Sequence, residues 1–230
     1  MIGLGKFFTI LFSVCTLAIM NLLSSCGSYT SMQTGRTIGA NTGEVTAGMF
    51  VANNTITNKI SIGDRKLIYP LFQASFRYGI IDPLDIGITF NTFGQLGLDG
   101  KFQIIGDRES IFALSAGFGF NTYWRSFYDL IIPVYLSVHP VDKLSIYLTP
   151  KWVHQSIVLS RKVSLSYINN SMGVLYGDQV KYGLEASYAF PLTRVIGQDV
   201  FPNIFTFGGA IKWTLGNKKQ TNSSKSKIRF

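Results

Sequence analysis

The sequence has 230 residues, a length that suits a single all-β domain. Only 14% of the residues are charged, whereas roughly 25% is usual for soluble domains, and aromatic residues also reach 14%. This balance argues against an ordinary soluble protein and fits a chain with lipid on one side. The net charge of +9 alone would suit nucleic acid, but the export signal at the N-terminus excludes that partner.

Residues 1–25 have the order of a secretory signal peptide. Lys6 is followed by an apolar run over residues 7–20, and small residues then lead to Cys26. The apolar run is too short and ends too abruptly to predict a membrane-spanning helix.

The tetrapeptide Leu23-Ser24-Ser25-Cys26 resembles a bacterial lipobox. That resemblance implies a diacylglyceryl group on the Cys26 thiol and cleavage just before this residue. Cys15 would then leave with the signal peptide, so no disulfide is expected. The alternative is an ordinary signal peptide that ends near an unrelated cysteine.

Residues 26–43 are rich in Ser, Thr and Gly and lack an apolar period, so we expect a flexible, acylated tether. From residue 44 to residue 216 the chain alternates with a period of two, which indicates β-strands. In the strand expected near residues 111–121, Phe112, Leu114, Phe118 and Phe120 share one face. Nine clear segments are expected at residues 44–52, 68–78, 84–93, 96–105, 111–121, 130–138, 144–154, 180–190 and 203–215.

This pattern predicts an all-β fold, a small antiparallel up-and-down transmembrane β-barrel. Bacterial barrels of one chain have an even number of strands, so one segment is misread. Residues 156–178 are the ambiguous region, and we favour eight strands over ten. Tight turns at residues 81–84, 106–109 and 139–142 alternate with mostly longer loops, as in membrane barrels.

The two faces of the expected strands differ in size and charge. Large apolar side chains occupy one face, which we expect to point into lipid. Small and charged side chains share the other face, where a narrow lumen would need room and paired charges. We expect a lumen charge network of Glu44, Arg77, Asp85, Asp99, Lys101, Lys151, Lys181, Glu185 and Lys212. The alternative is a lipid-anchored soluble β-sandwich or lipocalin-like carrier in the periplasm.

The stretch of residues 77–87, Arg-Tyr-Gly-Ile-Ile-Asp-Pro-Leu-Asp-Ile-Gly, resembles the strand–turn–strand signature of small Gram-negative outer-membrane β-barrel proteins. This resemblance covers residues 44–216, implies a location in the bacterial outer membrane and fixes no function. Residues 217–230 carry five basic residues in a polar setting, and we expect a disordered tail there.

No catalytic or metal-binding motif is evident, so we expect no cofactor and no metal. His139 lies in an expected turn. The element His154-Gln155-Ser156 faintly resembles the His-x-Ser element of outer-membrane lipid A deacylases, where a histidine base activates a serine. Ile157 replaces the usual asparagine, and no carboxylate follows at short spacing, so a chance match is favoured.

The sequence therefore predicts a non-enzymatic outer-membrane lipoprotein, an envelope component with a plugged or ligand-sized interior. Outer-membrane lipid is the expected partner, together with a small apolar ligand or an envelope protein. The alternative enzyme is a hydrolase that modifies lipid A.

Overall fold

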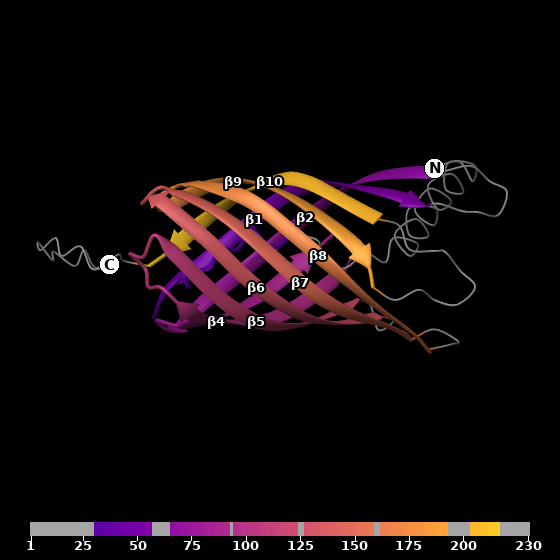
Figure 1. The fold of residues 1–230 in the computed structure, drawn as a ribbon, viewed down its shortest axis with the longest axis horizontal. Helices are drawn as coiled ribbons and strands as arrows, with labels where there is room; N and C mark the ends of the chain where they lie inside the picture. Colours follow the sequence, from indigo (N-terminus) through magenta and orange to yellow (C-terminus); the bar gives the residue numbers. More distant parts are fainter. Residues whose placement is uncertain are drawn as a thin grey trace, which may run out of the picture.

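The computed structural model describes residues 30–56, 65–92, 94–123, 127–158, 162–192 and 203–216. Within these ranges, ten antiparallel strands close into one barrel (Figure 1). Their bounds are β1 (Gly43–Ile56), β2 (Arg65–Ile81), β3 (Leu84–Asn91), β4 (Gln95–Ile105), β5 (Phe112–Tyr123), β6 (Phe127–Val141), β7 (Leu144–Val158), β8 (Lys162–Gly177), β9 (Val180–Pro191) and β10 (Asn203–Leu215). The predicted all-β barrel is confirmed, with ten rather than eight strands.

The strand that the sequence left ambiguous is β8, which lies within residues 156–178. Its two faces are mixed in polarity, which obscures the period of two. Ser166 and Asn170 lie on its outward face, whereas Leu165, Tyr167 and Leu175 are buried inside the barrel. Pairing of β8 with β7 and β9 along most of its length outweighs this weak local pattern.

The barrel closes because β1 pairs with β10 on one side and with β2 on the other. Gly43 lies opposite both Leu215 and Tyr78 in these two ladders. A closed barrel has no exposed strand edge, which distinguishes it from the sandwich that the sequence allowed. The sandwich alternative is therefore wrong.

Tight connections gather at the end of the barrel where β10 ends (left in Figure 1), which we call the C-terminal end. Between β4 and β5, the Asp107 carboxylate accepts hydrogen bonds from Ser110 and from the amide of Glu109, which lower the pKa of Asp107. Two connections at the opposite end are shorter than expected, because β6 already begins at Phe127 and β7 extends to Val158.

The outward face of the barrel carries the large apolar side chains that the sequence assigned to lipid. Phe118 at the middle of β5 is 57% exposed, and Leu184 on β9 is 60% exposed. Similar exposed side chains occur on every strand of the described barrel. Among the described residues, no helix has the length and apolarity that crossing a membrane would require.

The segment before β1 differs most from the expectation. Residues 30–42, called the lumen segment below, run inside the barrel from its middle to its C-terminal end, where Asn41 and Thr42 bond to Gly79. The expected flexible tether over residues 26–43 is therefore wrong for residues 30–42. Their polar backbone finds partners on the lumen wall instead of water. The expected signal peptide, Cys26 and the basic tail lie outside the described residues.

Candidate functional site: the polar lumen and its N-terminal segment

The charged residues of the expected network lie on the lumen face of seven strands. Seven of them are buried, and Asp99 and Lys181 are half-buried. The buried ones are Glu44, Arg77, Asp85, Lys101, Lys151, Glu185 and Lys212. Burial of so many charges is costly unless each one is paired or hydrogen-bonded, so their contacts indicate what the lumen holds.

One group of charges surrounds Arg77 on β2. Its guanidinium forms ion pairs with both Asp85 on β3 and Asp99 on β4. The Nζ of Lys101 lies 3.5 Å from the second oxygen of Asp85. Gly87 leaves the room for this cluster, because a Cβ there would come within 2.8 Å of both Arg77 and Asp99. Neighbouring strands thus position a compact network of both signs.

A second pair joins the two strands that close the barrel. The Nζ of Lys212 on β10 lies 2.7 Å from Oε1 of Glu44 on β1. The same ammonium donates a hydrogen bond of 2.7 Å to the carbonyl of Met32 in the lumen segment. Lys212 therefore connects the wall of the barrel to the chain inside it.

Two further lysines donate to carbonyls of the lumen segment. Lys151 donates to Thr30 at 2.9 Å. Lys101 donates to Arg36 at 2.8 Å and to Thr34 at 3.2 Å, and its ammonium lies 5.4 Å from the centre of the Tyr135 ring. The sequence predicted only charge-to-charge pairs, whereas the structure uses backbone carbonyls as additional partners for these cations.

Glu185 on β9 also binds the lumen segment, but as a hydrogen-bond acceptor, whereas the lysines are donors. Its carboxylate accepts from the backbone amides of Ser31 and Met32, at 2.8 and 2.6 Å. The hydroxyl of Tyr147 donates to it at 2.7 Å. The Ser31 hydroxyl also donates to it at 3.2 Å. A charged acceptor held by four donors is a strong, fixed site, and here three of the donors belong to the lumen segment.

Several lumen residues were not predicted as site residues. His139 is buried between Ser137 and Ser145, and each serine Oγ lies 2.8 Å from a ring nitrogen, so its expected turn position is wrong. Asp129 is fully buried and accepts from Gln155 at 2.8 Å, although the sequence placed it in a loop. Both residues continue the period of two of β6, which extends from Phe127 to Val141. This continued alternation in the sequence could have placed both side chains in the lumen.

The half of the lumen toward the opposite end is filled differently. A cluster of buried apolar side chains occupies it, contributed by strands β6 to β10. Its members are Ile131, Val153, Leu165, Tyr167, Ala189 and Ile204. Buried polar side chains such as Asp129 and Gln155 share this half of the lumen with the cluster.

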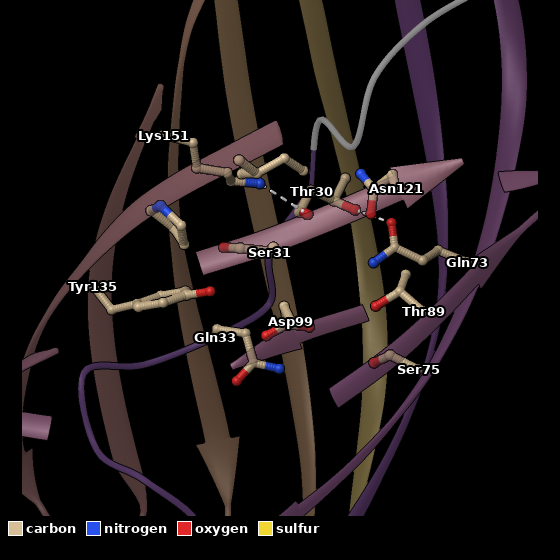
Figure 2. A pocket seen from close by; sticks show the side chains of 13 residues that line it. Thr30, Ser31, Gln33, Gln73, Ser75, Thr89, Asp99, Asn121, Tyr135 and Lys151 are labelled. Carbon is tan, nitrogen blue, oxygen red and sulfur yellow. Dashed lines mark hydrogen bonds between the residues drawn. The ribbon is translucent and has the colours of Figure 1, made fainter. Parts of the chain in front are cut away.

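A small cavity of about 60 Å³ remains where the lumen segment begins. Figure 2 shows Lys151, Tyr135, Gln73 and Asn121 around it, with Thr30 bonded to both Lys151 and Gln73. This volume suits a few water molecules, because one water occupies roughly 30 Å³ in the liquid. The cavity is well below the roughly 150 Å³ that holds an apolar molecule of the size of benzene.

The residues of the deacylase-like element lie away from the lumen. His154 and Ser156 are on the outward phase of β7, both half-exposed. His154 stacks on Trp152, and its Nδ1 lies 2.9 Å from Ser166 on β8. In the described parts of the chain, no three His, Cys, Asp or Glu side chains are grouped to hold a metal ion.

Comparison with known proteins gives no family. No protein-family model matches the sequence, and no curated protein matches it. Solved structures of similar shape are bacterial outer-membrane barrels. An outer membrane channel from Pseudomonas putida F1 is 11% identical, with a TM-score of 0.44 over 84% of this chain and 100% of that chain.

The outer membrane protease OmpT from Escherichia coli is 8% identical, with a TM-score of 0.43 over 82% of this chain and 100% of that chain. Ail, the attachment invasion locus protein of Yersinia pestis, is 8% identical, with a TM-score of 0.37 over 76% of this chain and 99% of that chain. These likenesses are too distant to carry any inference about activity.

Proposed function

We propose that this protein is an integral outer-membrane β-barrel whose lumen is closed by its own N-terminal segment. The exposed apolar face carries the proposal, because large side chains such as Phe118, Leu184 and Ile88 are exposed on the outside of the barrel. An apolar face of this kind around a closed barrel suits hydrocarbon, where unpaired strand edges are not tolerated. Outer-membrane lipid is then the first partner.

Within this proposal the protein is not an enzyme. The charges that could act as acids or bases in the lumen serve other groups, as Glu185 serves the lumen segment and Asp85 serves Arg77. A structural or binding component of the envelope fits this arrangement better than a hydrolase does. The cavity of about 60 Å³ favours a plugged interior over a carrier of apolar molecules.

A membrane extraction experiment tests the integral barrel. The chain is expressed with Cys26→Ser behind an ordinary cleavable signal, so that no acyl group can hold it. We expect it to remain in membranes after alkaline carbonate washing and to migrate differently on gels before and after heating. Release into the carbonate wash without detergent would contradict the integral barrel.

We also propose that Cys26 is acylated, as its lipobox-like tetrapeptide indicates. Cys26 precedes Thr30 by four residues, which span at most about 14 Å. The Thr30 hydroxyl bonds to Gln73 on β2, which lies opposite Asn91, the last residue of β3, so the barrel wall on this side ends near the level of Thr30. Acyl chains on Cys26 can therefore reach lipid past the end of β3 while Thr30 keeps its bonds.

Mass spectrometry of membrane-extracted protein tests this second proposal. We expect a mature chain that begins at an acylated Cys26. A chain that begins elsewhere would exclude the anchor and leave the integral barrel untouched. Deuterium exchange at the amides of Ser31 and Met32 should be equally slow in the acylated form and in the Cys26→Ser form, because both amides stay bonded to Glu185.

A further inference from the structure

The lumen wall recognises the lumen segment mainly through its backbone. The carbonyls of Thr30, Met32 and Arg36 accept from Lys151, Lys212 and Lys101, at 2.9, 2.7 and 2.8 Å. These lysines come from three different strands, β7, β10 and β4. Contacts of this kind do not depend on which side chains the bound segment carries.

Backbone amides of the segment are recognised as well. Glu185 accepts from Ser31 and Met32, and Gln103 accepts from Thr37 at 2.9 Å. Gly35 is held at both of its backbone groups, because its amide donates to Ser137 at 2.9 Å and its carbonyl accepts from Ser115. The wall thus offers donors and acceptors in the order that this one bent peptide conformation presents.

Several side chains of the segment also bond to the wall, as those of Thr30, Arg36 and Thr37 do, and two further positions select by shape. Met32 is buried in an apolar pocket, and the hydroxyl of Tyr147 lies 3.2 Å from its sulfur. The pocket is formed by Phe50, Leu71, Tyr147, Leu175 and Ala210. Met32 also has a φ of 45°, a left-handed conformation that costs a non-glycine residue free energy and that its contacts must hold in place.

Gly35 selects by exclusion. A Cβ at this position would lie 2.3 Å from the carbonyl oxygen of Ala113, a backbone atom that cannot move aside. Together these positions require a methionine three residues before a glycine. In contrast, the Thr34 hydroxyl bonds only weakly within the segment, to the carbonyl of Arg36 at 3.4 Å.

We propose that the lumen is a binding site for a peptide with the pattern Met-x-x-Gly, which residues 30–40 occupy as an intramolecular ligand. The contacts come from wall residues far away in the sequence, and the covalent link to β1 passes through the exposed Asn41. The site therefore does not need that link, and it should accept the same peptide from a separate chain. The proposal holds whether or not the barrel lies in the outer membrane.

The experiment cuts the link after the protein has folded. A protease recognition sequence is inserted between Asn41 and Thr42 of the full chain, and the protein is purified in detergent and cleaved. We expect the N-terminal fragment to stay bound through gel filtration. It should then exchange for a fluorescent peptide of residues 30–40, with saturable binding.

Peptide variants supply matched controls in the unaltered barrel wall. Gly35→Val and Met32→Ala peptides should each bind at least about tenfold more weakly, because one clashes and the other loses a buried side chain. A Thr34→Ala peptide should bind as the natural one does. Glu185→Gln in the barrel should weaken binding of every peptide by about tenfold or more, because a charged acceptor is lost.

Two results would overturn the proposal. Equal binding of the natural, Gly35→Val and scrambled peptides would reduce the site to nonspecific charge attraction and overturn the proposal. Failure of the cut barrel to retain its fragment or to take up the peptide would also overturn it. The heat-dependent gel shift reports whether the Glu185→Gln barrel is folded. If it is not folded, the peptide variants test the proposal in the unaltered barrel.

Discussion

The outward and lumen faces of the same strands have different requirements. On β5, Phe118 points outward and is largely exposed, while Ser115 on the opposite face is buried and bonds to the backbone of Gly35. Any apolar side chain of similar size would serve at the first position. At position 115, only a side chain that places a hydrogen-bond donor where the Ser115 hydroxyl lies can bond to the carbonyl of Gly35. The outward face is therefore specified by residue class, and the lumen face by individual partners.

Loss of one lumen charge should have the largest effect. Arg77→Met leaves the carboxylates of Asp85 and Asp99 without their main partner, and a broken buried pair costs roughly 3–5 kcal/mol. Urea unfolding in lipid vesicles measures this loss of unfolding free energy. We expect a value near the lower limit, because Lys101 stays 3.5 Å from Asp85.

Arg108→Met is the matched control for that change. Arg108 forms a 3.4 Å ion pair with Asp82 at the end of the barrel, and its side chain is 50% exposed compared with 5% for Arg77. Its removal should cost about 0–1 kcal/mol. Equal losses for the two variants would mean that the lumen charges are solvated and that the two faces do not differ as described.

A charge on the outward face should have the next largest effect. Phe118→Arg places a cation near the middle of β5, where lipid-facing arginine costs roughly 2–4 kcal/mol at the membrane midplane. The same unfolding assay measures the loss, and Phe118→Leu is the control that keeps the position apolar. Normal stability of the arginine variant would place this face outside the membrane.

How far the sequence predicts the molecule follows the same division. The outward face was predictable because only residue class matters there, and nine of the ten strands showed the period of two. β8 was missed because Ser166 and Asn170 lie on its outward side. The charged residues were assigned to the lumen face for the same reason, since alternation alone decides their side of the strand.

The lumen segment could not be predicted in this way. A sequence rich in Ser, Thr and Gly, without a period of apolar residues, fits a solvated tether and a peptide bound through its backbone equally well. What distinguishes them is the wall, and the residues that accept from the amides of Met32 and Gly35, Glu185 and Ser137, lie more than 100 residues away. Gly35 and the methionine three residues before it were the local signs, but their meaning depends on Ala113 and Tyr147.

A third prediction concerns transport through the lumen. The purified full chain in a planar bilayer should show no steady conductance. The lumen segment occupies one half of the lumen, and the apolar cluster around Val153 and Tyr167 lies in the other half. A stable channel of porin size would show that the lumen contacts do not persist in the membrane. The heat-dependent gel shift confirms that the protein in the bilayer assay is folded.

The smallest effect is expected for the polar residues on the outward face. His154 and Ser156 lie there without a described carboxylate to orient the histidine, and His154 contacts Ser166 on β8. Lipid A from cells that overexpress the protein should have the same mass as lipid A from cells that express Ser156→Ala or carry an empty vector. Loss of one acyl chain only with the natural serine would make the outward face catalytic and the protein a lipid A hydrolase. An unchanged mass fits a face that contacts lipid and does no chemistry on it.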